Sequence, residues 1–281
     1  MSENSRLRLA RIVRQPAGDL AEAALLCCVE IEPDLDVDAE LLRLDAFADG
    51  LRAAGHVPGE PRADAEALAA HLPGDLGFSG EVERYHDPRN ALLTTVLDRK
   101  RGLPIALSIV YVSVARRAGI AAFGINAPAH FLVGVTSPRR PAGSPAVHPV
   151  VVDPFHGGML LSEAEVDERV RAATGGEGRF SPSMLRPAPT PLVLRRLLNN
   201  LTRDFLAEGD VEDALWTVEL KRLLPGSSPQ DVRVAGELLF QLGRYRDAAD
   251  TLEDYVVRTG SEAEEIEAIA RLALQSRAKM N

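Results

Sequence analysis

A repeat in the last third of the chain limits its fold more than any other sequence feature. Gly209 and Gly243 are 34 residues apart, and the same interval separates Ala214 from Ala248. In each copy the glycine lies between two segments with apolar residues at helical spacing, and the alanine follows five residues later. The interval predicts two successive helical hairpins of one kind, in which the small alanine lets the helices approach closely.

A 34-residue period with a glycine turn and a following small residue is typical of tetratricopeptide-type hairpins. We therefore predict an all-α region over residues 188–281, ended by a capping helix at 261–277. The proline-rich stretch RPAPTP, residues 186–191, marks its start. Because two copies are fewer than a free-standing array usually needs, the preceding part of the chain is expected to support the other end.

The middle of the chain, residues 85–187, is predicted to combine helices with short strands. A helix over about 105–118 is apolar on more than one side, which is typical of a buried central helix. The segments HFLVGV (130–135) and PVVVDPF (149–155) are short and rich in β-branched residues, as strands are. Residues 136–148 between them are rich in Pro, Gly and Ser, which predicts a long surface loop.

The first part of the chain, residues 1–84, is predicted to be helical and to carry packing rather than chemistry. The dense helix-forming run from Ala21 to Ile31 is ended by Pro33. It contains the two cysteines, Cys27 and Cys28, which are adjacent and are expected to stay reduced. The predicted fold class is therefore α+β: N-terminal helices, a central helix on a small antiparallel sheet, and then all-α hairpins.

Charge and composition restrict the partners. The formal net charge is −9, and no run of five or more basic residues provides a local exception. Nucleic acid and anionic membranes would be repelled at long range, so neither is an expected partner. The N-terminus is too polar for a signal peptide, and no segment supplies the roughly 18 apolar residues of a membrane span. We expect a cytoplasmic protein.

His130 and Asp153 are expected to lie together. If the two predicted strands form an antiparallel hairpin, a register that pairs residue 133 with residue 150 also pairs His130 with Asp153. Cross-strand partners share one face of a sheet, so the carboxylate could orient the imidazole. That pair is the base-and-orienter half of a hydrolase triad. The alternative is two separately satisfied polar residues at strand ends.

Three motifs carry a resemblance to a known family. They are YHDPRNALLTTVLDRKRGLPIALSIVYVSVARRAGI, NAPAHFLVGV and VVDPFHGGMLLS, in this order. The chain resembles the SirB-type family, whose members join a transglutaminase-like, papain-like domain to tetratricopeptide repeats. Two positions depart from the family pattern. Ala129 stands where the family tends to have glycine, and Gly134 stands where it tends to have arginine.

The resemblance implies a catalytic frame without its nucleophile. In transglutaminase-like domains a cysteine opens the central helix, a histidine opens the following strand and an aspartate ends the next one. His130 and Asp153 match the last two roles, whereas the cysteine position falls at Pro104, with Ile105 beside it. Pro104, Ile105 and Asn126 are expected to line the ligand pocket.

Three alternatives could restore the missing chemistry. Ser108 lies one turn inside the same helix, but a hydroxyl bonded to a backbone carbonyl is the more common role at such a position. Cys27 or Cys28 could approach from the N-terminal region, although free cysteines are commonly buried small hydrophobes. A metal could use His130, Asp153 and His156, but no compact ligand spacing supports it. We therefore expect no metal and no cofactor.

The leading prediction is a non-catalytic transglutaminase-like protein that binds a protein or peptide in the groove of its repeats, or acts as a regulatory module. The alternative is an acyl-transfer enzyme of the amidase, peptidase or transglutaminase class. In that enzyme His130 would take the nucleophile's proton, Asp153 would orient the ring, and Ser108 or water would attack. A third possibility is that the first two regions only stabilise the repeats.

Overall fold

The computed structural model describes residues 3–15, 18–128, 130–137, 148–259 and 263–279. These residues form two compact units, one of residues 15–194 and one that combines residues 1–14 with 195–281. The division into 1–84, 85–187 and 188–281 stays a prediction, because the compact units group most of the N-terminal helices with the mixed region. Most of the predicted 136–148 loop, like Ala129, lies outside the described residues.

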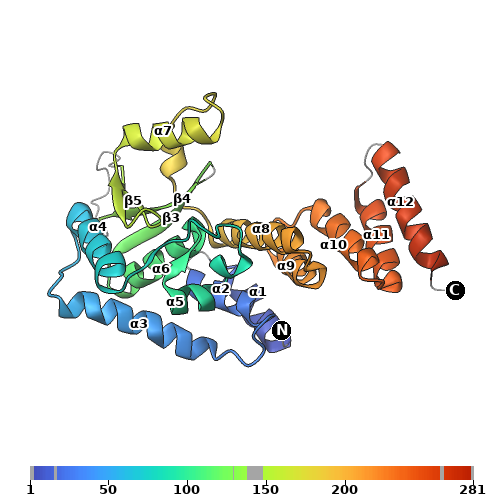
Figure 1. Cartoon of the computed structure of the whole chain (residues 1–281), viewed down its shortest axis with the longest axis horizontal. Helices are drawn as coiled ribbons and strands as arrows, with labels where there is room; N and C mark the ends of the chain where they lie inside the picture. Colours follow the sequence, from blue (N-terminus) through green and yellow to red (C-terminus); the bar gives the residue numbers. More distant parts are fainter. Residues whose placement is uncertain (1–2, 16–17, 129, 138–147, 260–262, 280–281) are drawn as a thin grey trace. The chain divides into compact units, whose positions relative to one another are not determined.

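Helices make up the first part of the larger unit (Figure 1). They are α2 (Leu20–Cys28), α3 (Val37–Ala53), α4 (Pro61–Ala69) and the π-helical turn η1 (Ala70–Asp75). The side chain of Asp19 caps α2 by accepting hydrogen bonds from the backbone N–H groups of Ala21 and Glu22. Every α2 residue except Glu22 is buried, so this helix belongs to the core of the unit.

The central helix of the unit is α6 (Pro104–Arg117), which follows the short helices η2 (Pro88–Asn90) and α5 (Leu93–Arg99). All α6 residues from Pro104 to Ala115 are buried, which confirms the predicted buried central helix. Gly119 ends it with a φ of 88°, a left-handed conformation that glycine adopts without steric cost. Ile120 N–H then donates to the Ala115 carbonyl and closes the last turn.

A four-stranded antiparallel sheet packs on this helix. Its strands, in spatial order, are β3 (Ala121–Ala127), β4 (His130–Thr136), β5 (Val150–Asp153) and β6 (Met159–Leu161). The pair β1 (Ser79–Gly80) and β2 (Arg101–Gly102) is separate and parallel. The predicted register of β4 against β5 is wrong by two residues, because Val133 pairs with Val152 and not with Val150. A shift of two keeps every side chain on its predicted face.

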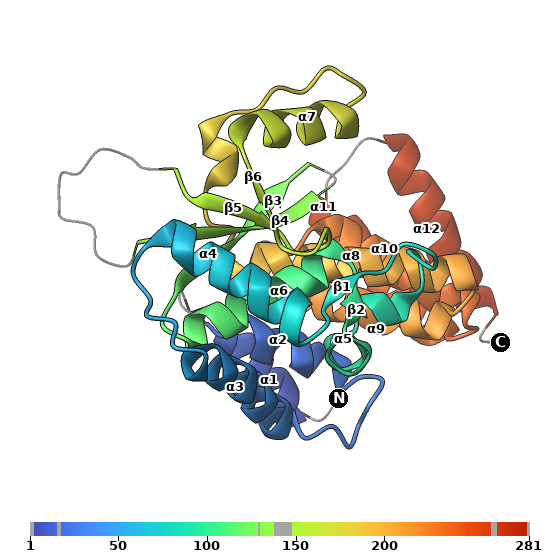
Figure 2. The same ribbon diagram turned by 60° about the vertical axis from the view of Figure 1, so that its left-hand side comes forward.

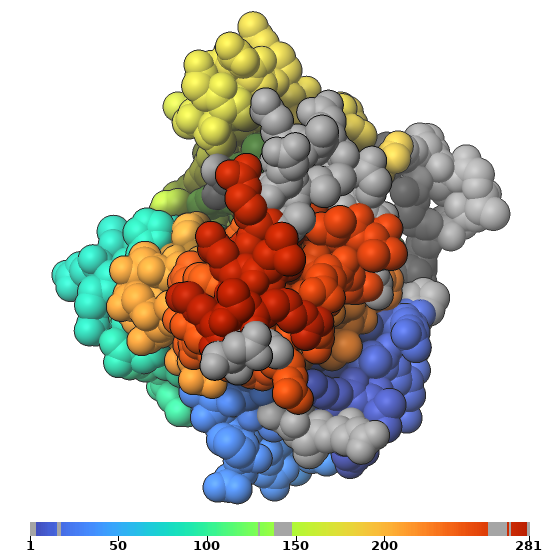
Figure 3. Space-filling view, turned by 90° about the vertical axis from the view of Figure 1, so that its right-hand side faces the viewer, coloured from blue at the N-terminus to red at the C-terminus, as the bar shows by residue number. Residues whose placement is uncertain are grey.

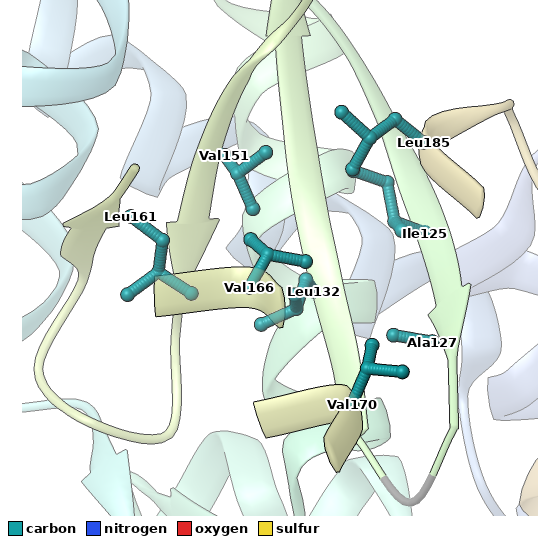
Figure 4. Packing of buried hydrophobic residues seen from close by; sticks show 8 residues of the cluster. All are labelled: Ile125, Ala127, Leu132, Val151, Leu161, Val166, Val170 and Leu185. Carbon is teal, nitrogen blue, oxygen red and sulfur yellow. The ribbon is translucent and has the colours of Figure 1, made fainter. Parts of the chain in front are cut away.

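Helices cover both faces of the sheet. Helices α4 and α6 lie on one face, and α7 (Glu163–Ala173) with the short helix η3 (Pro182–Leu185) lies on the other (Figure 2). On the α7 face, side chains from all four strands meet those of α7 and η3 (Figure 4). The buried members are Ile125, Ala127, Leu132, Val151, Leu161, Val166, Val170 and Leu185. This cluster holds α7 against the sheet, which brings Arg169 close to the end of β5.

The smaller unit is helical. It contains α1 (Glu3–Ile12), most of α8 (Thr190–Glu208), α9 (Val211–Leu223), α10 (Pro229–Gln241), α11 (Tyr245–Thr259) and α12 (Ala263–Ala278). Consecutive helices from α9 to α12 pack against each other. Figure 3 shows this unit in space-filling form with its last helices, in orange and red, toward the viewer. Among the described residues of both units, no helix has the length and apolar character needed to cross a membrane.

We expect Gly236→Ala to destabilise the smaller unit. Glycine to alanine within a helix normally stabilises by up to about 1 kcal/mol. Here a Cβ on Gly236 in α10 would lie 2.5 Å from Leu252 Cδ2 and 2.6 Å from Cγ, so overpacking of about 1–3 kcal/mol is expected to dominate. Chemical denaturation measures the difference. In a Leu252→Ala background the same change should become neutral or stabilising; an unchanged penalty there would contradict this explanation.

Candidate functional site

The side chains of His130 and Asp153 meet at one end of the sheet. His130 opens β4 and Asp153 ends β5, and the two chain ends lie close because the strands are antiparallel. His130 Nε2 is 3.0 Å from Asp153 Oδ2, a hydrogen-bonding distance. The Asp153 side chain is 0% exposed and that of His130 is 19% exposed. The predicted catalytic roles of this pair stay predictions.

The turn after β5 adds a second histidine. Asp153 Oδ1 accepts hydrogen bonds from the backbone N–H groups of Phe155 (3.2 Å) and His156 (3.4 Å), so the carboxylate organises its own turn. This turn directs His156 Nδ1 to 2.8 Å from Asp153 Oδ2. The rings of His130 and His156 are stacked, with centroids 5.7 Å apart and an interplanar angle of 26°. The Phe155 and His130 rings meet edge to face, with centroids 6.5 Å apart.

A positive side chain from the covering helix completes the surroundings of the carboxylate. Arg169 of α7 brings Nη2 to 3.4 Å from Asp153 Oδ2. Sequence reasoning missed this residue, because nothing in the local pattern of a polar helix 16 positions later indicates contact with the end of a strand. The sequence indicates His156 as a possible metal ligand or as part of a plain turn, but no local pattern predicts that its ring bonds to Asp153.

The pKa of Asp153 reflects two opposing effects. Burial raises the pKa of this carboxyl group, because the charged form loses its hydration. The hydrogen bonds and positive charges of His130 and His156 outweigh burial and lower the pKa from 3.8 to about 2. The carboxylate is therefore ionised at neutral pH and is the negative centre around which three basic side chains gather.

The first turn of α6, where the resemblance puts the nucleophile, is apolar. Pro104 is its first residue, and Pro104 and Ile105 are both buried. Ser108, one turn later, is 0% exposed and donates its hydroxyl hydrogen to the Phe131 carbonyl oxygen, 3.2 Å away. The described hydrogen bond of Ser108 is thus to the backbone and not to His130.

The two thiols lie in a different part of the unit. Cys27 and Cys28 are buried in α2, where their sulfur atoms lie 3.3 Å and 3.5 Å from the carbonyl oxygens of Ala23 and Ala24. Burial raises the pKa of both thiols, so the reactive thiolate form is disfavoured. Their described partners do not include His130.

The predicted ligand pocket stays a prediction. Pro104 and Ile105 are buried on α6, whereas Asn126 is exposed near the end of β3. Gly134, where the resembling family tends to have arginine, packs closely with β3. A Cβ at this position would lie 2.7 Å from two ring carbons of Phe123. A larger residue could be accommodated only if Phe123 moved.

His130, Asp153 and His156 are also the described residues that could hold a metal ion. Each offers one ligand atom, and the three atoms lie within 4.8 Å of one another. Two imidazole nitrogens and a carboxylate oxygen form a ligand set that zinc accepts. The site can therefore act as a hydrogen-bonded base, as a structural anchor for the turn, or as a metal ligand set.

Comparison with known proteins agrees with this frame of a central helix on a small antiparallel sheet. A family model described as the transglutaminase-like superfamily matches residues 38–199, which is more than half of the chain. The chain is 34% identical over 242 residues to a UPF0162 protein of Xylella fastidiosa, covering 84% of this chain and 83% of that protein. The chain therefore belongs to the transglutaminase-like superfamily and, within it, groups with the UPF0162 proteins.

Other relatives match different lengths of the chain. A UPF0162 protein of Vibrio cholerae is 24% identical over 241 residues, covering 85% of this chain and 86% of that protein. F-box only protein 21 of Mus musculus is 30% identical over 115 residues, which is 40% of this chain and 18% of that protein. The likeness to this much longer protein is thus confined to a segment.

Two neighbouring glycines allow a test of the turn that carries His156. Gly157 and Gly158 have φ values of 67° and 73°. Gly157→Ala should cost about 1–2 kcal/mol for the left-handed backbone alone, because a Cβ there meets nothing within 4 Å. Gly158→Ala should cost clearly more, since its Cβ would lie 2.9 Å from Ala69 and 3.0 Å from the buried Tyr111 hydroxyl. Equal losses in denaturation experiments would contradict this packing.

Asp153→Asn should destabilise the protein by about 2 kcal/mol at neutral pH, the equivalent of a pKa lowered from 3.8 to about 2. Because the folded pKa lies below the unfolded one, this stabilisation is present above the unfolded pKa and disappears as pH falls toward the folded value. The difference between wild type and variant, measured by urea unfolding, should therefore shrink from about pH 5 to about pH 2. A difference that does not change with pH would refute the paired carboxylate.

Proposed function

We propose that this protein is a non-catalytic member of the transglutaminase-like superfamily that binds a protein or peptide through its C-terminal helices. The observation that carries the proposal is the apolar, buried first turn of α6, where Pro104 and Ile105 stand in place of a nucleophile. Ser108 and the two thiols are engaged with backbone carbonyl groups in the described structure. The remaining His130–Asp153 pair therefore orients a base with which none of these three described side chains is hydrogen-bonded.

Equivalent residues 34 positions apart have the same backbone conformation or burial, which supports tetratricopeptide-type hairpins in the C-terminal helices. Gly209 and Gly243 both adopt left-handed conformations, with φ values of 86° and 73°. Ala214 and Ala248 are both fully buried, as expected where two helices approach closely. Hairpins of this type stack into surfaces that hold extended partners. The SirB-type relationship belongs to the same proposal, because it joins this repeat to a transglutaminase-like domain.

The absence of acyl transfer can be tested with purified full-length protein. Hydrolysis and aminolysis of simple glutamine amides and peptide amides should show no rate that depends on His130. Wild type, His130→Ala and Ser108→Ala should then give the same background rate. A rate that falls at least tenfold in His130→Ala would overturn the proposal, and a matching fall in Ser108→Ala would identify the nucleophile.

Peptide binding can be tested with a displayed library of random peptides. Peptides selected on the full chain should bind it in solution, and hydrogen exchange should then slow within residues 195–281. The His130→Ala variant should bind with unchanged affinity, because its side chain belongs to the other unit. If hydrogen exchange slowed only in the sheet and α6, the peptide would bind the transglutaminase-like part and not the C-terminal helices. Failure to select any binding peptide from libraries of several lengths would count against the proposal.

A further inference from the structure

We propose that His130, Asp153 and His156 form a binding site for one Zn²⁺ ion, a property that goes beyond the proposed peptide binding. The three donors would be His130 Nε2, Asp153 Oδ2 and His156 Nδ1. Two imidazoles and one carboxylate are the protein ligands of many zinc sites that keep a fourth position for water. The sequence spacing of these residues predicts no such site. The fold brings them together.

Two of the three donor separations already lie near the value that zinc requires, and all three donor atoms lie within 4.8 Å of one another. With metal–ligand distances of about 2.0–2.2 Å, neighbouring donors around a tetrahedral zinc ion are about 3.3 Å apart. Asp153 Oδ2 is 3.0 Å from His130 Nε2 and 2.8 Å from His156 Nδ1. Each imidazole nitrogen would move a few tenths of an ångström away from Oδ2 to reach this spacing, and the ion would take the place of the hydrogens shared between these atoms.

The other oxygen of Asp153 holds the carboxylate in place. Its Oδ1 accepts the backbone N–H groups of Phe155 and His156, which leaves Oδ2 as the metal ligand. Hydrogen bonds of this kind orient ligating carboxylates in metal proteins. Solvent reaches the cluster at His156, whose side chain is 48% exposed, whereas the side chain of Asp153 is fully buried. An ion could therefore enter past His156 without unfolding the sheet.

Arg169 is the neighbour that opposes a cation. Its Nη2 lies 3.4 Å from the same oxygen, so a bound ion would have a positive charge close by. The side chain is long and 25% exposed, so rotation toward solvent would take Nη2 away from Oδ2. Its Nη1 donates to the Glu165 carbonyl oxygen at 3.4 Å, a bond within its own helix that such a rotation would have to keep or replace. This opposition makes a specific prediction: removing the charge of Arg169 should tighten zinc binding, whereas removing a ligand should weaken it.

The test is a titration of the full chain, purified without a histidine tag, with Zn²⁺ against a competing chelator. We expect one ion per chain in the wild type. His130→Ala and His156→Ala should each weaken binding by more than about tenfold, the lower end of the loss seen when even an outer partner of a metal ligand is removed. Arg169→Gln should bind several-fold more tightly. His148→Ala is the matched control, because His148 is paired with Glu163 and does not belong to the group of three ligands.

Three results would overturn the zinc site: no binding of one ion, equal binding by wild type and His156→Ala, or equal weakening by His148→Ala. His156 is the decisive position, because its side chain is 48% exposed and its removal leaves Asp153 paired with His130, Arg169 and a backbone N–H group. Circular dichroism and thermal unfolding would verify that the variant is folded. The readout is binding and not turnover. The zinc site and the proposed peptide binding therefore succeed or fail separately.

Discussion

The end of the sheet in the transglutaminase-like part is arranged around the hydrogen bonds and ion pairs of one buried carboxylate, that of Asp153. A charge that is 0% exposed is stable only if it is paired and hydrogen-bonded. Asp153 meets this requirement with two imidazoles, one guanidinium and two backbone N–H groups. These partners come from β4, from the turn after β5 and from α7. One side chain thus ties together the end of the sheet and the helix that covers it.

The histidine–aspartate pair and the first turn of the central helix differ in chemical character. The pair has a hydrogen bond like that between a base and its orienting acid, whereas Pro104 and Ile105 in the first turn of α6 are apolar and buried. A thiolate at a helix N-terminus would be stabilised by the helix dipole, but proline and isoleucine have no group that could use this effect. On the proposal of a non-catalytic protein, the polar cluster of His130, Asp153 and His156 has another role, such as holding the turn after β5 or binding a cation.

Local sequence patterns predicted much of the fold. The apolar surface of residues 105–118 requires a buried helix, and β-branched runs on either side of a polar loop require paired strands. Both are present, as α6 and as β4 with β5. The repeated interval of 34 residues corresponds to glycines with left-handed backbone and to fully buried alanines. These features depend on the periodicity and the size of neighbouring side chains, which a sequence displays directly.

The sequence by itself determined which residues are polar on an apolar strand, and so singled out His130 and Asp153. It could not determine the register of β4 and β5, because slipping by two residues leaves the pattern of faces unchanged. Only the tertiary structure brought His156 and Arg169 to the carboxylate. His156 arrives through the turn that Asp153 itself organises, and Arg169 arrives because α7 packs on the sheet through Val166 and Val170. Both contacts follow from packing between elements, which no local pattern records.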